Sequence, residues 1–598
     1  MTDYQPPFRD IGFVLDHLVD MDELCQLEPF KHTDPATIKG VLEEYGRFVA
    51  DQVAPLNRIG DEQGSVHDPV TGSVATPDGF ADAYRQYVAA GWGAVPFPAE
   101  YGGGGFPWVM GMAMQEIITS ANMAFSMAPL LTQGAIEMLL EHGSEEQKEI
   151  YVQKMVTGEW SGTMNLTEPQ AGSDLGAIRT KAVKQDDGTY LITGTKIFIT
   201  FGEHDMADNI VHLVLARTPD APPGTKGISC FVVPKLMVND DGSVGARNDL
   251  KCVSIEHKLG IKASPTCVMS YGDNGGAVGY LIGEENQGMR YMFTMMNNAR
   301  LSVGLEGMSV AERAYQDSRQ YAQERRQGRA LGSEAGEQSL IVEHPDVRRM
   351  LMTQKALVEA MRAVIYVEAE SIDLARHHPD PEMREVKRDL VELLTPVAKA
   401  WCTDMGVEVA SLAIQVYGGM GFMEESGVPQ HFRDVRITPI YEGTNGIQGM
   451  DLVGRKLPLK GGGVVTEFLS MIASLDPVLL RHGTRLKPVR SHLAEALTTL
   501  ADTTHWILEH GMDDPRDALA GATPYLRMFS LVTAGWLMAR QALVAKTALD
   551  NGESDPSIEA KLATALFFCE HILPAANGLA PAVTAGFAST MAVPPELL

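Results

Sequence analysis

Tyr441-Glu442-Gly443-Thr444-Asn445-Gly446 is the segment around which the chain is organised, because it sets a carboxylate between an aromatic residue and a glycine-rich turn. It follows the apolar run 435–440 and precedes a predicted helix from Ile447 to Lys456. Glycine and asparagine let the backbone turn sharply and approach a ligand closely. Apolar neighbours would limit the hydration of Glu442 and strengthen it as a base. A solvated helix cap fits the same residues, so the rest of the sequence must decide.

The composition, with 45% hydrophobic and 21% charged residues, is typical of a globular protein. At 598 residues the chain has room for about four domain-sized units. The net charge of -28 argues against nucleic-acid binding, which needs clustered lysine and arginine, although acidity also simply favours solubility. The cysteines form no C-x-x-C pair, so we expect neither disulfides nor a metal site, and a reducing compartment. They are Cys25, Cys230, Cys252, Cys267, Cys402 and Cys569.

The first ten residues contain acids and prolines without an apolar core, so no secretory signal is expected. The longest apolar stretch, Met528 to Ala539, meets Arg540 before it reaches the length of a membrane span. We therefore expect a soluble cytoplasmic protein without integral membrane association.

Helical periodicity dominates both ends of the chain. Asp34-Pro35 predicts a capped helix start, and Ser144 with Gln147 predicts a capping box. Long helices are predicted at 289–326, 345–377 and 381–417, with a kink or break at Pro396. Further helices are predicted at 13–18, 78–90, 108–122, 129–141 and 144–156, and beyond residue 464.

Between these regions the pattern changes to short β-branched and aromatic runs separated by turns. Strands are predicted at 190–193, 196–201, 210–216, 227–233 and 264–271, with loops between antiparallel strands at 218–224 and 239–242. The predicted fold class is multidomain α+β: a helical N-terminal domain, an antiparallel β-barrel-like middle domain, a long-helix bundle and an extra C-terminal helical domain. The expected boundaries are 1–34 (extension), 35–157, 158–284, 285–458 and 464–598.

Two segments of the middle domain carry polar groups suited to a flat, phosphorylated cofactor. In 166–174 the hydroxyls of Thr167 and Ser173 lie near Gly172, whose backbone amides suit a pyrophosphate; a polar β-turn is the plainer interpretation. In 196–200, strand alternation places Phe198 and Thr200 on one face, where an aromatic ring and a hydroxyl could meet a cofactor. A half-buried strand explains that segment equally well.

Four motifs in one order resemble the acyl-CoA dehydrogenase family. They are Thr167-Glu168-Pro169-Gln170-Ala171-Gly172-Ser173-Asp174, Lys196-Ile197-Phe198-Ile199-Thr200, Gln415-Val416-Tyr417-Gly418-Gly419-Met420-Gly421-Phe422 and Ile440-Tyr441-Glu442-Gly443-Thr444. The resemblance covers about residues 35–456. The additional terminal regions resemble the longer subgroup, which includes 3-methylthiopropanoyl-CoA dehydrogenases and broad-range bacterial enzymes.

The resemblance implies FAD as cofactor, held without a G-x-G-x-x-G fingerprint. It implies that Leu166, Thr167 and Ser173 contact the flavin ring and pyrophosphate. Phe198, where the family usually has tryptophan, and Thr200 would lie against the ring. The ADP part of a FAD on a neighbouring subunit would be bound by Arg325, Gln415, Gly418, Gly419 and Thr444. Gly446 stands where the family often has glutamine.

The same resemblance assigns the reaction, an α,β-dehydrogenation as in fatty acid β-oxidation. Glu442 would remove the pro-R α-proton of an acyl-CoA while the β-hydrogen leaves to the flavin, giving trans-2-enoyl-CoA. Some relatives place the base just before an arginine of the earlier helix, where this chain has Ala299 before Arg300, and alanine cannot take a proton. Electrons would pass to electron-transfer flavoprotein, and a homodimer or homotetramer is expected. Substrate contacts would come from Ser173, Arg300, Tyr441 and Gly443, a helix-surface salt bridge being the alternative for Arg300.

Three alternatives remain open at this point. An acyl-CoA oxidase using oxygen would carry the same motifs. A DNA-binding flavoprotein of the family would use a basic face such as Arg481, Arg485, Lys487 and Arg490, but the acids between 502 and 517 oppose it. A degenerate CoA-binding scaffold would not need Glu442. Met292, Met295 and Met296 fit either a flexible acyl pocket or a helix core, so the acyl chain, fatty or 3-methylthiopropanoyl, stays open.

Overall fold

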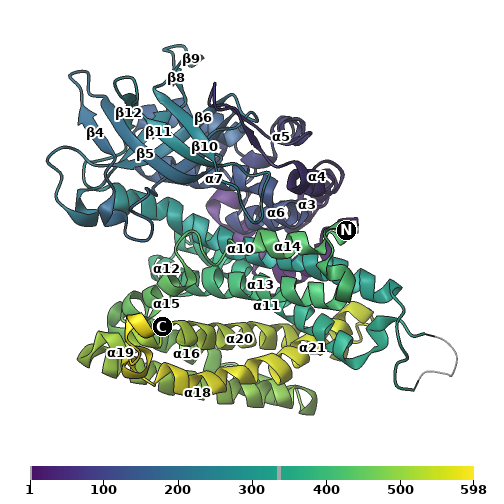
Figure 1. The fold of residues 1–598 in the computed structure, drawn as a ribbon. Helices are drawn as coiled ribbons and strands as arrows, with labels where there is room; N and C mark the ends of the chain where they lie inside the picture. The colour runs from purple at the N-terminus through teal and green to yellow at the C-terminus, as the bar shows by residue number, and fades with distance from the viewer. Residues whose placement is uncertain (1–2, 333–337) are drawn as a thin grey trace. The chain divides into compact units, whose positions relative to one another are not determined.

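The computed structural model describes residues 3–332 and 338–598 (Figure 1). The chain forms two compact units. One contains the chain up to Gly40 together with Val303–Leu598, and the other contains Val41–Ser302. The divisions fall inside two helices, α3 (Pro35–Phe48) and α10 (Gly288–Glu324). The four predicted domain boundaries stay a prediction.

The helices of Val41–Ser302 begin where side chains cap them. The Ser144 and Gln147 capping box is confirmed at α8 (Glu145–Gln147), which continues through the π-turn η5 (Lys148–Val152) into α9 (Gln153–Thr157). Helix α7 (Met123–His142) starts at Met123 and not at Pro129, because the Asn122 side chain caps it by accepting from the Phe125 amide at 3.1 Å. The other helices here are α4 (Leu56–Gln63), α5 (Phe80–Ala89) and α6 (Trp108–Ala121).

The middle domain is built on one large sheet in the order β10-β11-β5-β12-β7-β6-β3, with β4 beside β5. Its pairs are antiparallel except β3 with β6, which are parallel. The sheet is therefore mixed and not purely antiparallel as predicted. The chain between β3 and β6 forms β4 and β5, and this long segment supplies the crossover that a parallel pair requires. The strands are β3 (Trp160–Asn165), β4 (Lys181–Lys184), β5 (Tyr190–Thr200), β6 (Asn209–Ala216), β7 (Ser229–Pro234), β10 (Leu250–Ile255), β11 (Thr266–Tyr271) and β12 (Ala277–Leu281).

Two short hairpins accompany this sheet. β8 (Leu236–Val238) and β9 (Val244–Arg247) pair antiparallel across the predicted turn 239–242, and β1 (Val66–His67) pairs with β2 (Val74–Ala75). The large sheet packs closely against α7, because Gly162 of β3 has no side chain: a Cβ there would meet the Ala135 Cβ at 2.5 Å. The Gly162 amide also donates to the Thr132 hydroxyl of α7 at 3.1 Å.

Long helices form the unit that contains Val303–Leu598. Helix α11 runs over the predicted range, Pro345–His377. Helix α12 (Pro381–Pro396) ends at Pro396, as predicted, and passes through the π-turn η9 (Val397–Trp401) into α13 (Cys402–Tyr417). Helix α20 packs against α11, α18 and α21. The C-terminal helices include α16 (Gly463–Ala473), α18 (Lys487–Asp513), α20 (Ala522–Asp550) and α21 (Pro556–Phe567).

Within the part of the chain that the structure describes, four helical runs are long and apolar enough to cross a membrane by length and composition: Met123–His142, Leu459–Arg481, Ala522–Asp550 and Pro556–Val583. The prediction that Arg540 ends the apolar stretch too early was therefore wrong, because α20 continues through Arg540 to Asp550. The apolar windows of α7 and α20 are 89% and 83% buried inside the protein, whereas those of the other two runs are 28% and 39% buried. Core packing accounts for the composition of α7 and α20.

The N-terminal extension is more ordered than its irregular composition predicted. It forms α1 (Phe8–His17) and α2 (Met21–Gln26). Asp10 of α1 pairs with Lys561 of α21 at 2.6 Å, and Lys561 also reaches Glu359 of α11 at 3.1 Å. Burial alone would raise the pKa of Asp10, but the neighbouring cations, Lys561 first, hold it below its ordinary value.

We expect Asp10→Asn to lower the free energy of unfolding by about 2 kcal/mol, between the effects of breaking an exposed and a buried ion pair. Because the pKa is depressed, this stability is present above the unfolded value of 3.8 and is lost as the pH falls below it. Urea denaturation at pH 7 measures the change. Asp16→Asn, an exposed site on the same helix, is the control and should change stability little. Equal effects of the two substitutions would contradict the role of the ion pair.

Candidate active site

Glu442 lies in a turn between α14 (Val428–Val435) and α15 (Asn445–Asp451). Its side chain is half-buried, and its backbone adopts φ +55°, followed by Gly443 at φ +85°. A left-handed backbone costs a residue with a side chain about 1 kcal/mol or more, so surrounding contacts must hold it. Such strain is concentrated at functional sites.

Asn445 supplies those contacts. Its Oδ1 accepts from the buried Lys399 ammonium at 2.8 Å, and its Nδ2 donates to Asp404 Oδ1 at 2.7 Å and to the Ala400 carbonyl at 3.0 Å. These partners belong to η9 and α13, so one amide side chain fastens the turn to the helix behind it. Burial raises the pKa of Asp404, against the hydrogen bond from Asn445. The Thr444 hydroxyl caps α15 by accepting from the Ile447 amide at 3.3 Å.

Tyr441 is held from a different helix. Its hydroxyl donates to Oε2 of Glu306, a fully buried residue of α10. Sequence reasoning missed both Glu306 and the anchoring role of Asn445. The Asn-Gly pair did signal a turn, but nothing in the sequence showed which helices the turn contacts.

The flavin-contacting residues predicted in the middle domain come together in Val41–Ser302. The Leu166 carbonyl accepts from the Lys196 ammonium at 2.9 Å, and the Thr167 carbonyl accepts from the Ile197 amide at 2.9 Å. Phe198 is 58% exposed. The chain after β3 therefore lies along the end of β5, with Leu166 and Thr167 beside Phe198 and the half-buried Thr200.

Phe198 occupies a β-bulge that the predicted alternation did not include. The register between β5 and β11 shifts between Cys267 and Met269, and the Phe198 backbone takes φ +59°. Strand β5 runs without a break through Gly194 and Thr195, which separate the two predicted strands, and the bulge lies in its second half. The Phe198 side chain is exposed there.

Glu168 holds the loop that carries Thr167 and Ser173 in place through several hydrogen bonds. Its buried carboxylate accepts from Lys196 at 2.9 Å, from the Thr180 hydroxyl at 2.6 Å and from the amides of Arg179 and Thr180 at 2.6 and 3.0 Å. Burial would raise the pKa of Glu168, but Lys196 and these donors lower it to about 2. Ser173 is exposed in the same loop, and a Cβ at Gly172 would meet open space. The loop thus presents a hydroxyl and an accessible backbone.

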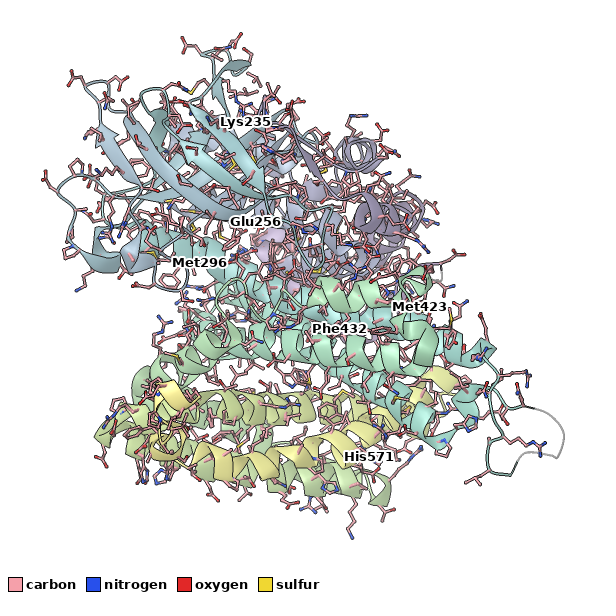
Figure 2. The ribbon with its side chains drawn as sticks, in the orientation of Figure 1. Lys235, Glu256, Met296, Met423, Phe432 and His571 are labelled. Atoms are coloured by element: carbon pink, nitrogen blue, oxygen red, sulfur yellow. The ribbon has the colours of Figure 1, made fainter. Side chains whose placement is uncertain are left out.

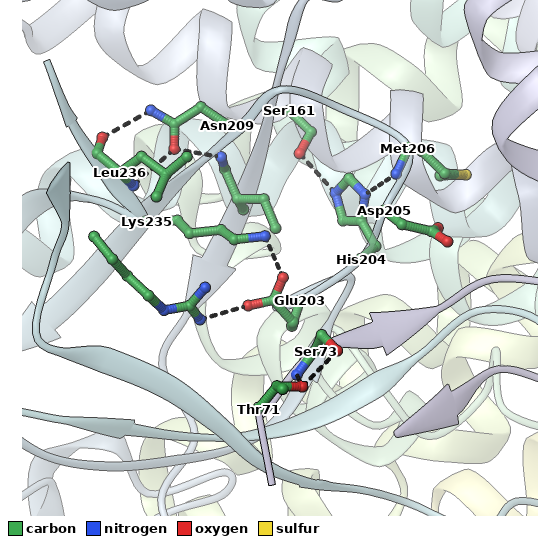
Figure 3. A network of polar contacts seen from close by, with 12 residues as sticks. Thr71, Ser73, Ser161, Glu203, His204, Asp205, Met206, Asn209, Lys235 and Leu236 are labelled. Atoms are coloured by element: carbon green, nitrogen blue, oxygen red, sulfur yellow. Dashed lines mark hydrogen bonds and ion pairs between the residues drawn. The ribbon is translucent and has the colours of Figure 1, made fainter. Parts of the chain in front are cut away.

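A second polar network holds the turn after Thr200 (Figure 3). Glu203 accepts from Lys235 and, at 2.9 Å, from Arg247. The His204 ring bonds Ser161 through Nε2 at 2.8 Å and accepts from the Met206 amide through Nδ1 at 3.1 Å. Burial lowers the pKa of His204 to about 3, so the ring is neutral. These contacts fix the end of β5.

The predicted ADP-binding residues lie at two helix ends that touch. The Tyr321 ring of α10 stacks on Tyr417 of α13 with centroids 4.1 Å apart. Arg325 lies just past the end of α10, one turn after Tyr321. Gln415, Gly418 and Gly419 lie within two residues of Tyr417, and they and Arg325 are all exposed. Gly418 has φ +61°, and no atom lies within 4 Å of a Cβ built there. The described contacts of Thr444 are with Ile447 and not with this surface.

Arg300 is buried, which excludes the surface salt bridge considered for it. Its guanidinium lies 6.0 Å from the Phe293 ring and donates to Asn297 at 3.4 Å. Met292 and Met295 are buried as well, and Met296 is half-buried (Figure 2). Burial favours the core interpretation for the first two methionines.

Four family models match successive parts of the chain. They are the acyl-CoA dehydrogenase N-terminal domain (residues 37–159), middle domain (163–273) and C-terminal domain (286–457), and an acetyl-CoA dehydrogenase C-terminal-like domain (465–594). With the fold and the glutamate turn described above, they define an oxidoreductase acting on CH–CH groups. The chain belongs to the acyl-CoA dehydrogenase family.

Individual relatives match over nearly the full length. The chain is 48% identical to 3-methylmercaptopropionyl-CoA dehydrogenase of Ruegeria pomeroyi, over 95% of this chain and 96% of the relative. It is 35% identical to the broad-specificity linear acyl-CoA dehydrogenase FadE5 of Mycobacterium tuberculosis, over 96% of each. The fold is similar to that of an acyl-CoA dehydrogenase from Bacillus anthracis solved with FAD, with a TM-score of 0.73, 20% identity and coverage of 96% and 91%.

We expect Glu168→Ala to destabilise the protein by about 3–5 kcal/mol, because it leaves the buried Lys196 ammonium without its carboxylate. The pKa of Glu168 is depressed, so its contribution is present above the unfolded value of 4.5 and is lost as the pH falls toward 2. Urea denaturation at pH 7 measures the loss.

Lys251→Ala is the matched control, since it breaks an exposed 2.9 Å pair with Asp273 on the same sheet and should cost about 1 kcal/mol or less. If Glu168→Ala lowered the free energy of unfolding no more than Lys251→Ala, the loop would not depend on the hydrogen bonds of Glu168.

Proposed function

We propose that the protein catalyses the FAD-dependent α,β-dehydrogenation of an acyl-CoA thioester to trans-2-enoyl-CoA, with Glu442 as the base. The observation that carries the proposal is the placement of Glu442: a half-buried carboxylate on a left-handed turn that Asn445 anchors. Catalytic bases need a fixed position and limited hydration. The names of the relatives in Ruegeria and Mycobacterium support the reaction class.

The residues present fit FAD. The loop of Thr167 and Ser173 offers hydroxyls and open backbone at Gly172, and the exposed Phe198 ring beside Thr200 offers a surface for a flavin ring. The exposed Arg325, Gln415, Gly418 and Gly419 would hold the ADP part of a FAD from a second subunit. The Bacillus anthracis structure, which is described as complexed with FAD, supports this cofactor.

The chain's own residues would handle the proton and the thioester. Glu442 takes the pro-R α-proton onto its carboxylate, and its backbone amide donates to the thioester oxygen, where negative charge develops. When bound, FAD accepts the β-hydrogen as a hydride. Ser173, Arg300, Tyr441 and Gly443 are the proposed contacts of the acyl-CoA, and Leu166 and Phe198 are proposed contacts of the flavin.

We propose a short acyl chain, with 3-methylthiopropanoyl-CoA as the first candidate, because the Ruegeria relative carries that substrate in its name and shares 48% of the sequence. A linear fatty acyl chain is the second candidate, on the name of FadE5. A panel of acyl-CoAs from short to long, including 3-methylthiopropanoyl-CoA, separates them. Electron-transfer flavoprotein is the proposed acceptor, and comparing reoxidation of the reduced flavin by that protein and by air distinguishes a dehydrogenase from an oxidase.

The basic cluster considered for nucleic-acid binding is partly neutralised within the protein. Arg490 pairs with Asp476 at 2.8 Å, and Arg485 pairs with Glu559. Paired arginines are poor phosphate ligands, so the enzyme remains the proposal over a DNA-binding flavoprotein. We also propose a cytoplasmic location.

We propose a homodimer or homotetramer, because a shared FAD site requires a second subunit. An apolar patch next to Gly418 and Gly419 supports it: Met420, Phe422 and Met423 are 50%, 86% and 48% exposed (Met423 is labelled in Figure 2). Exposed apolar clusters of this kind mark contact surfaces.

Glu442→Gln should retain bound yellow FAD and lose flavin bleaching by substrate, because an amide cannot accept the α-proton. We expect a rate loss of at least about 10³-fold, in the range for removal of a general base. Anaerobic stopped-flow absorbance measures it. Glu467→Gln, an exposed site on α16, is the control and should bleach normally. Near-normal bleaching by Glu442→Gln would show that another residue is the base.

Phe422→Asp should dissociate the oligomer and weaken FAD retention, because it places a charge in the proposed subunit contact. Light scattering after size-exclusion chromatography, with the flavin-to-protein absorbance ratio, measures both effects. Val70→Asp, at a site 91% exposed in the other unit, should change neither. A Phe422→Asp protein of unchanged mass and flavin content would contradict this assignment.

A further inference from the structure

Glu306 is an enclosed carboxyl directly behind the catalytic turn. It is 0% exposed on α10, and its Oε2 accepts the Tyr441 hydroxyl. Its Oε1 has no hydrogen-bond partner among the described residues. Because Tyr441 immediately precedes Glu442, this single bond ties α10 to the backbone that carries the base.

Glu306 and Glu168 show how the number of donors decides the charge of a buried carboxyl. Glu168 accepts five hydrogen bonds, from Lys196, Gln170, the Arg179 amide and both the amide and the hydroxyl of Thr180, which stabilise the ionised form. Glu306 accepts one, from a neutral hydroxyl. A charge at Glu306 would therefore be almost uncompensated, and the neutral acid is the cheaper form inside the protein.

The surroundings of Glu306 point the same way. Burial raises its pKa to about 8; the Tyr441 hydrogen bond lowers it, the Glu442 charge raises it and Lys399 lowers it. These three groups, two on the turn and one on η9, are the ionisable neighbours that act on it among the described residues. Lys399 itself donates to Asn445 at 2.8 Å. This raised pKa favours the neutral acid of Glu306 at pH 7.

We propose that Glu306 is a positioning residue of the reaction, which holds Tyr441 and thereby the Glu442 turn, and which must stay uncharged for Glu442 to take the α-proton. The inference rests on the proposed function of Glu442. As a neutral acid, Glu306 accepts the Tyr441 hydroxyl without adding charge to the site. Once ionised, it places a second negative charge beside Glu442 and opposes the negative charge that develops on the thioester.

Glu368 offers a closely matched control in the same unit. It is also fully buried, and burial raises its pKa to about 8. Its Oε1 accepts one hydroxyl, from Thr395 of α12 at 2.8 Å, and its Oε2 has no partner among the described residues. Glu368 therefore reproduces the burial and bonding of Glu306, but its hydrogen bond leads to α12 and not to the catalytic turn.

The test is anaerobic single-turnover flavin reduction by the fastest acyl-CoA of the panel, from pH 6.5 to 9.5, in the holoenzyme. The wild-type rate should fall roughly tenfold or more above pH 8, following one ionisation. Glu306→Gln keeps an acceptor for Tyr441 but cannot ionise, so its rate should change less than about twofold over the same range. Glu368→Gln should keep the wild-type fall. A profile of Glu306→Gln that superimposes on wild type would overturn the proposal.

Stability provides a readout besides turnover. An acid whose folded pKa is raised makes the protein less stable as the pH rises from 4.5 to about 8, because the folded state must keep a proton that the unfolded state has lost. Glu306→Gln and Glu368→Gln should both flatten this dependence in urea denaturation, whereas only Glu306→Gln should change the rate profile. An unchanged pH dependence of stability in Glu306→Gln would overturn the proposal, since Glu306 would then be ionised throughout.

Should Glu306→Gln fail to fold, Tyr441→Phe tests the same bond. Losing the hydroxyl removes a group that lowers the pKa of Glu306, so the fall in rate should move to higher pH. A fall at the wild-type position would overturn the proposal. Failure of the parent proposal is distinguishable: if no acyl-CoA bleaches the wild-type flavin, the proposed function fails and the inference with it, whereas bleaching with indistinguishable profiles overturns the inference alone.

Discussion

The left-handed backbone at Glu442 is the constraint on which the catalytic turn depends. A glutamate does not adopt φ +55° by preference, so the turn exists only because its neighbours make other conformations costlier. Asn445 does so by bonding Lys399, Ala400 and Asp404. The strain is held by buried polar groups that would lose their partners if the turn relaxed, and the carboxylate is thereby fixed before any substrate arrives.

The middle domain also contains a strained residue held by buried polar groups. Phe198 adopts φ +59° in a bulge next to the ion pair of Glu168 and Lys196. The glutamate turn and the Phe198 segment therefore each combine a strained residue with a buried lysine. The difference lies in the carboxyls. Glu168 has enough donors to remain charged, while Glu306 has one and remains neutral. The lysine and the donors around Glu168, and the complete burial of Glu306 with a single donor, favour opposite protonation states of the two carboxyls.

Sequence reasoning located the periodic elements well and the contacts between them poorly. Helix α11 and the capping box at Ser144 follow from local patterns, so they were predictable. The bulge at Phe198 was not predictable, because it depends on pairing with β11. The start of α7 at Met123 was missed because Pro129 was interpreted as the first residue of the helix. Glu306 carries no signal at all: its partner is Tyr441, on a segment remote in sequence, and an isolated glutamate in a helix is normally a surface residue. Glu442 could be found from the sequence because a turn with left-handed backbone angles favours glycine and asparagine, which follow it at 443, 445 and 446.

The interrupted helix behind the turn supplies the hydrogen-bond partners of Asn445. Pro396 ends α12, and the chain continues as the π-turn η9 before α13 resumes. A π-turn changes the backbone bonding from i→i+4 to i→i+5, so the helix is irregular at η9. The Ala400 carbonyl of η9 accepts from Asn445 Nδ2 at 3.0 Å and from the Thr403 hydroxyl at 3.0 Å. Lys399 of η9 donates to Asn445, and Asp404 of α13 accepts from it, so the irregular helix supplies three hydrogen-bond partners that hold the backbone next to the base.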